Sequence, residues 1–156
     1  MVHDDELIEV PCARCVGCLE RRRRDWAVRM THEAELHAEN CFITLTYDQE
    51  HVPEDASLDI THWQRFAKRL RKRRGPFRFY HCGEYGPETL RPHLHACLFS
   101  MDFPDKLLVD DSKSGQPMYE SATLNEVWGM GRTTVQSFTP ETAAYTAGYV
   151  MKKNWQ

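Results

Sequence analysis

The sequence lacks any long apolar run. Although 41% of its 156 residues are apolar, no stretch approaches the roughly 18 residues that a membrane-spanning helix requires. A secretory signal is absent too, because the acidic start Met1–Glu6 does not resemble the positively charged start of a signal peptide. We therefore expect one globular domain, residues 1–156, that has a core of its own, lies in a cytoplasm and does not contact a membrane.

An excess of positive charge, which nucleic-acid-binding domains commonly have, is also missing. The net charge is −3, from 20 Lys and Arg against 23 Asp and Glu. The cations are clustered, however, in Arg21–Arg24 and in Arg65–Arg74, and the second block contains no acid. Such clusters create the local positive field that phosphates require, although a solvated helix face would show the same pattern. We expect phosphate contacts from Arg65, Lys68, Arg69, Lys72, Arg73 and Arg91.

Disulfides are not expected, because six cysteines without secretory context fit reduced thiols or a metal site better. Cys12, Cys15 and Cys18 in the N-terminal segment 1–18 recur at a three-residue step, as in the first half of a zinc knuckle. A second ligand pair at zinc-finger spacing is missing. The fourth ligand of a structural Zn²⁺ would have to be a histidine or one of the other cysteines, Cys41, Cys82 and Cys97. Zinc binding and simple reduced thiols both remain open.

Two histidines alternate with apolar residues in the segment Arg91–Phe99. This pattern predicts a half-buried strand that carries His93 and His95 on one face, where two ring nitrogens can converge on one divalent metal. Residues 77–84 predict an antiparallel neighbour that brings Glu84 beside them. Two nitrogens and one carboxylate with open positions suit Mg²⁺ or Mn²⁺ that must also hold a phosphate oxygen. Each residue alone would be read as a polar residue on a solvated surface, so the prediction rests on the combination.

The remaining periodicities predict the other elements. Helices are expected at residues 19–38, from the N-cap Asp59 to Gly75, at 122–128, and from Thr139 onward. Strands are expected at 41–47 and 132–138, and residues 107–119 predict a β-hairpin.

The last of these helices carries two tyrosines. Tyr145 and Tyr149 are four residues apart and Lys152 follows after three more, so two phenols and an ammonium share one helix face. Alanines and a glycine around them keep this face thin enough for a bulky substrate backbone to approach. A tyrosine-containing core helix is the alternative interpretation, and the absence of large aliphatic neighbours argues against it.

Five separated blocks resemble the HUH endonucleases, which initiate rolling-circle replication, and more closely the replication initiators of gokushovirus-type Microviridae, single-stranded DNA bacteriophages. The tyrosine pair resembles the two-tyrosine class of these enzymes. In sequence order the blocks are PCARCVGC at 11–18, CFITLTY at 41–47, HCGEYG at 81–86, RPHLHACLF at 91–99 and YVMKK at 149–153.

The resemblance implies an α+β domain of ferredoxin-like or RNA-recognition-like fold, with a central antiparallel sheet, packed helices, the metal on the sheet and the tyrosine helix across it. It implies metal-dependent nicking and joining of single-stranded DNA at a hairpin-associated viral origin in the host bacterial cytoplasm, with host replication proteins as further partners. We expect Tyr149, helped by Lys152, to form a 5′-phosphotyrosine, and Tyr145 to act in strand transfer.

Such initiators usually continue past the tyrosine helix, so we expect the chain to be an excised domain of a longer initiator. Two other functions share part of the pattern. A non-catalytic single-stranded nucleic-acid-binding module of RNA-recognition-like fold would have the sheet and the basic helices. A structural zinc protein would be organised by the N-terminal cysteines.

Overall fold

Six strands form one antiparallel sheet in the spatial order β2-β3-β1-β6-β5-β4. The computed structural model describes residues 10–86, 90–112 and 115–152, and for Met151 and Lys152 it describes the backbone only. None of the helices in these ranges combines the length and apolarity that a bilayer crossing needs. In chain order the elements are α1 (Val16–Glu35), β1 (Asn40–Thr46), α2 (Ile60–Arg74), β2 (Arg78–Tyr85), β3 (Pro92–Phe99), β4 (Lys106–Asp111), β5 (Pro117–Ser121), α3 (Ala122–Trp128), β6 (Thr133–Ser137) and α4 (Pro140–Lys152).

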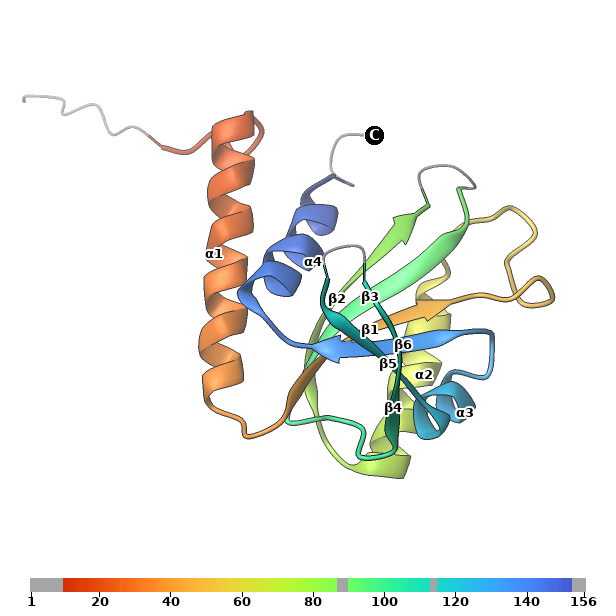
Figure 1. Cartoon of the computed structure of the whole chain (residues 1–156). Coiled ribbons are helices and arrows are strands. Elements are labelled where there is room, and N and C mark those ends of the chain that lie inside the picture. Colours follow the sequence, from red (N-terminus) through yellow and green to blue (C-terminus); the bar gives the residue numbers. More distant parts are fainter. Residues whose placement is uncertain (1–9, 87–89, 113–114, 153–156) are drawn as a thin grey trace, which may run out of the picture.

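Helices cover both faces of the sheet. Figure 1 shows α1 and α4 on one side and α2 and α3 on the other. The alternation along β1 explains this arrangement, because Ile43 and Leu45 are fully buried in the core under α2 and α3, whereas Phe42 joins a second core under α1 and α4. The predicted α+β fold with a central antiparallel sheet is therefore confirmed.

The helices begin and end where short-range signals predict. The carboxylate of Asp59 accepts a hydrogen bond from the backbone N–H of Thr61 at 2.8 Å and so caps α2. Gly129 follows α3 in the left-handed conformation, with φ of 63°, and Thr139 caps α4 by accepting from the N–H of Thr142 at 3.2 Å. Only the first helix is displaced from its predicted range, because it begins directly after the extended residue Cys15.

Candidate active site

The β2–β3 pairing brings the three predicted metal ligands together. Glu84 lies opposite His93, and His95 follows two residues later on the same face of β3. Their ligand atoms all lie within 4.8 Å of one another. The Nε2 atoms of His95 and His93 are 2.9 Å and 3.5 Å from the same oxygen of Glu84. The strand register thus assembles two imidazoles and one carboxylate beneath α4.

Hydrogen bonds at the other ring nitrogens hold the two imidazoles in place. Nδ1 of His93 is 3.1 Å from the carbonyl oxygen of Arg91, and Nδ1 of His95 is 3.0 Å from the hydroxyl of Thr44. Because a carbonyl can only accept, neutral His93 must carry its proton on Nδ1 and turn the lone pair of Nε2 toward Glu84. Two acceptors then face each other at 3.5 Å, which a cation between them would stabilise. The donor set therefore fits a divalent metal.

The protonation states also suit metal binding. Burial by itself raises the pKa of Glu84, but hydrogen bonds from His95, Tyr145 and Tyr149 outweigh it and lower that pKa to about 2. Burial is also the main reason why the pKa of His95 is lowered. An ionised carboxylate and a neutral imidazole are the forms that bind metals.

Helix α4 places both tyrosines over this set. The hydroxyl of Tyr145 donates a hydrogen bond of 2.6 Å to Glu84, and its ring meets that of His95 edge-on at 5.3 Å. The Tyr149 ring lies 4.9 Å from that of Tyr145. Burial, followed by the neighbouring carboxylate, raises the pKa of both phenols, so both are protonated before a cation or substrate arrives.

Small side chains let α4 approach the sheet this closely. Ala143 and Ala147 are fully buried, and the hydroxyl of Thr146 lies 3.6 Å from the thiol of Cys97 on β3. On its other flank α4 meets α1, where Nε of Arg23 donates to the carbonyl oxygen of Ala144 at 3.0 Å. The side chain of Lys152 lies outside the described residues, so its predicted place beside the phenols stays a prediction.

The basic helix α2 packs on the opposite face of the sheet from the metal ligands. Its predicted phosphate contacts divide into two kinds. Arg69 donates to the carbonyls of Val127 and Trp128, at 2.9 Å and 3.0 Å, and so binds the C-terminal end of α3. Exposed cations that make no ion pair or hydrogen bond with other described residues are Arg65, Lys68 and Lys72.

The Arg69→Ala variant is expected to lose about 1–2 kcal/mol of unfolding free energy, because it removes two charge-assisted hydrogen bonds to helix-end carbonyls. The neighbouring Lys68→Ala variant is the matched control and should stay within about 0.5 kcal/mol of the parent. Urea unfolding of both variants measures the difference. Equal stability of the two would show that the Arg69 contacts contribute nothing.

The N-terminal cysteines converge as their spacing predicts. The sulfurs of Cys12, Cys15 and Cys18 all lie within 4.8 Å of one another. In the described part of the chain, no other cysteine, histidine or acidic residue belongs to this group. The predicted fourth ligand is not found among the remaining cysteines, which are buried in the first three strands of the sheet: Cys41, Cys82 and Cys97.

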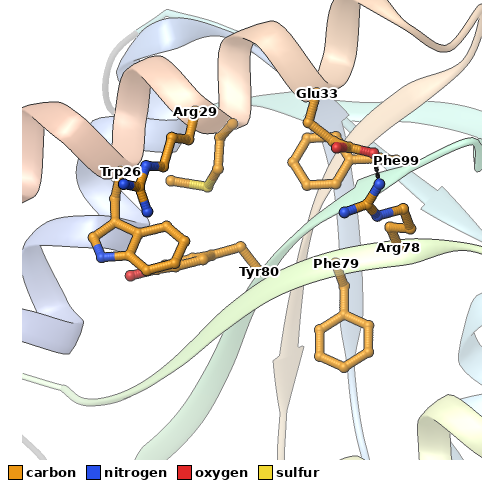
Figure 2. A pocket seen from close by; sticks show the side chains of 8 residues that line it. Trp26, Arg29, Glu33, Arg78, Phe79, Tyr80 and Phe99 are labelled. Carbon is orange, nitrogen blue, oxygen red and sulfur yellow. Dashed lines mark ion pairs between the residues drawn. The ribbon is translucent and has the colours of Figure 1, made fainter.

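A groove of about 240 Å³ lies between α1 and the edge strand β2. Figure 2 shows Trp26, Arg29 and Tyr80 at one end and the ion pair between Glu33 and Arg78, 3.2 Å long, at the other. Sequence reasoning did not predict this groove, because it depends on how α1 packs beside β2. It also missed Thr44, although the alternation of polar and apolar residues in segment 41–47 puts Thr44 on the face that bears the ligands.

Comparison with known proteins places the chain among phage replication proteins. A family model that describes replication-associated protein ORF2 matches residues 40–154. The chain is 36% identical over 154 residues to the replication-associated protein ORF2 of Spiroplasma virus 4, covering 92% of this chain and 48% of that protein. It is 33% identical over 152 residues to the replication-associated protein VP4 of Bdellovibrio phage phiMH2K, covering 92% and 48%.

A third relative is the replication-associated protein ORF4 of Chlamydia phage 1, which is 34% identical over 153 residues and covers 92% of this chain and 38% of that protein. The chain thus spans about half the length of the first two relatives or less. No solved structure matches it. The resemblance to the replication proteins of gokushovirus-type phages is confirmed, and the chain belongs to the family of replication-associated protein ORF2.

Proposed function

We propose that this chain nicks and rejoins single-stranded DNA at a phage replication origin by metal-dependent tyrosine transesterification, in the host bacterial cytoplasm. The observation that carries the proposal is the 2.6 Å hydrogen bond from Tyr145 to Glu84, which joins a nucleophile to a set of metal ligands. A binding module of the same fold would need neither the ligand set nor the tyrosines beside it.

The residues divide the work of a phosphoryl transfer. Mg²⁺ or Mn²⁺ held by Glu84, His93 and His95 would neutralise the phosphodiester and polarise its scissile P–O bond. A phenol oxygen attacks phosphorus from the opposite side and loses its proton to solvent. The bond to the 3′-oxygen breaks, and that oxygen takes up a proton. The products are a 5′-phosphotyrosine and a free 3′-hydroxyl, which can prime synthesis.

The two phenols have different starting positions. Tyr145 is held as a hydrogen-bond donor to Glu84, whereas Tyr149 lies one helical turn further along α4. We propose that Tyr149 attacks first, with the ammonium of Lys152 stabilising its phenolate. Tyr145 then attacks the regenerated origin while the first tyrosine still holds the old DNA end.

A cleavage assay on a library of single-stranded origin oligonucleotides tests the proposal. In the presence of Mn²⁺ we expect a DNA product with a free 3′-hydroxyl and a protein whose mass has increased by the 5′ fragment. A protein that binds the oligonucleotides but forms no adduct with any of them would instead be a non-catalytic binding module.

The free cations of α2 give the proposal a second measurable consequence. Because α2 faces away from α4, we propose that it contacts a DNA segment other than the one at the metal, such as the flank of an origin hairpin. Arg73, which pairs with Glu126 at 3.5 Å, extends this surface, and Arg91 supplies a contact at the start of β3. Host replication proteins are further proposed partners of the complete initiator.

Replacing Arg65, Lys68 and Lys72 together with alanine should weaken DNA binding and flatten its salt dependence. The slope of log K against log salt should fall by roughly 0.7 for each lost phosphate contact, or by about 2 in all. Fluorescence anisotropy between low and moderate salt measures the slope. The control is Arg132→Ala, which removes a cation already paired with Glu120 at 2.8 Å. A slope equal to the parent's would mean that α2 is only a solvated face.

A further inference from the structure

The three N-terminal thiols have the geometry of a preformed metal site. Sγ of Cys12 lies 3.7 Å from Sγ of Cys18, and the backbone N–H of Cys15 points at Sγ of Cys12 from 3.3 Å. Zinc bonds thiolates at about 2.3 Å, so the edge of its tetrahedron is about 3.8 Å long. The observed sulfur separation matches that edge.

The local backbone is bent in a way that no apolar core supports. Ala13 adopts the left-handed region with φ of 59°, which costs a non-glycine residue conformational energy. Val10 and Val16 on either side are 78% and 76% exposed, so the bend buries neither of these large apolar side chains. A bound ion is the interaction that would hold such a segment together.

We propose that Cys12, Cys15 and Cys18 supply three of the four ligands of a structural Zn²⁺, which fixes the start of α1. An iron–sulfur cube would bond each cysteine to a different iron and would need its sulfurs farther apart. Mg²⁺ and Mn²⁺ prefer oxygen ligands, so the two sites of this chain select different metals. The fourth position is filled by water or by a group outside the described residues.

The surroundings of the thiols favour their ionised form. Cys15 and Cys18 lie at the first turn of α1, where the unpaired N–H groups of a helix favour negative charge. The basic block Arg21–Arg24 follows within the next two turns. Three thiolates around Zn²⁺ leave one negative charge, which both features stabilise.

Metal analysis of the purified chain tests the zinc site. We expect one zinc per chain, X-ray absorption showing three sulfurs and one nitrogen or oxygen ligand, and loss of zinc in Cys18→Ser. Cys41→Ala, which removes a buried cysteine outside the group, should keep its zinc. In the zinc-free variant the amides of residues 17–19 should exchange with solvent at least about tenfold faster.

Other results would overturn the site. Iron–sulfur absorption, fewer than three sulfur ligands, or a zinc content that Cys18→Ser leaves unchanged would each contradict it. Glu84→Gln separates this site from the proposed nuclease centre, because it should leave the zinc in place.

The groove between α1 and β2 carries a second inference, which rests on the proposed function. Tyr80 lies on the same face of β2 as Glu84 and four residues away, about 13 Å along the strand. The Trp26 ring lies 5.1 Å from that of Tyr80, and the guanidinium of Arg29 covers it at 5.1 Å. Arg29 is exposed and makes no ion pair with another described residue.

We infer that this groove binds one base of the DNA strand that is cleaved at the metal. The base would stack on Trp26 in place of Arg29, whose guanidinium is then free to pair with a phosphate. A volume of about 240 Å³ is below the usual size of a pocket for a drug-like ligand and suits one base.

Binding and cleavage by two variants at one position test this inference. Trp26→Leu should weaken single-strand binding at least about fivefold, whereas Trp26→Phe, which keeps an aromatic face, should stay within about twofold of the parent. If both variants bind and nick like the parent, the groove is no base site while the proposed function stands. If the parent itself neither binds nor nicks, the proposed function fails first.

Discussion

The double variant Tyr145→Phe/Tyr149→Phe is expected to form no covalent DNA adduct and to lose nicking by at least about three orders of magnitude, since no phenol remains to attack phosphorus. Its affinity for the oligonucleotide should stay close to the parent's, because the metal ligands and the cations are unchanged. Denaturing gels with a labelled oligonucleotide measure the adduct, and anisotropy measures binding. An adduct that persists in the double variant would remove the tyrosine mechanism.

The single variants assign the order of attack. Tyr149→Phe should lose most of the adduct on a short oligonucleotide, whereas Tyr145→Phe should keep it and fail in strand transfer. Mass spectrometry of peptides from the adduct identifies the modified residue. An adduct found only on Tyr145 would reverse the assignment, and the 2.6 Å hydrogen bond from its hydroxyl to Glu84 would then mark the attacking phenol.

His93→Ala and His95→Ala are each expected to lower metal-dependent cleavage at least about a hundredfold, because each removes a ligand from a three-residue set. Glu84→Gln should be milder, since an amide oxygen can still bind the ion. Thr44→Val, which removes only the hydroxyl at Nδ1 of His95, should weaken Mn²⁺ binding about tenfold. Titration calorimetry with Mn²⁺ and cleavage rates measure these effects.

The fold provides the control for these ligand variants. The ligand face of β3 is separate from the core face that carries Leu94 and Ala96, so unfolding midpoints should change little in His93→Ala. Cleavage at the parent rate by either histidine variant would mean that the metal assignment is wrong. If EDTA leaves nicking unaffected, no metal site of this kind takes part in the reaction.

Short-range patterns predicted the elements of this fold because their causes are local. The alternation of segment 41–47 and the caps at Asp59 and Thr139 are set by neighbours within a few residues. The convergence of Glu84 with His93 followed from one hairpin-like pairing. These features needed only the geometry of a strand and of a helix end.

Contacts between distant elements decided the rest. Nothing in the pattern of Arg65–Arg74 indicates which face of the sheet the helix covers, or that Arg69 binds the end of α3, 58 residues away. The strand order places β1 between β3 and β6, and only this order brings Thr44 to His95. Such pairings depend on how the whole sheet packs, which periodicity does not encode.

The wide spread of these contacts along the chain has a consequence for the order of folding. Glu84 and His95 are 11 residues apart on adjoining strands, whereas Tyr145 reaches Glu84 across 61 residues. Closing a loop of about 10 residues takes on the order of 10–100 ns, and long-range closures are slower and entropically costlier. A ribosome also releases α4 after β2 and β3. A nascent chain therefore gathers its carboxylate and imidazoles first, and the phenols join them last.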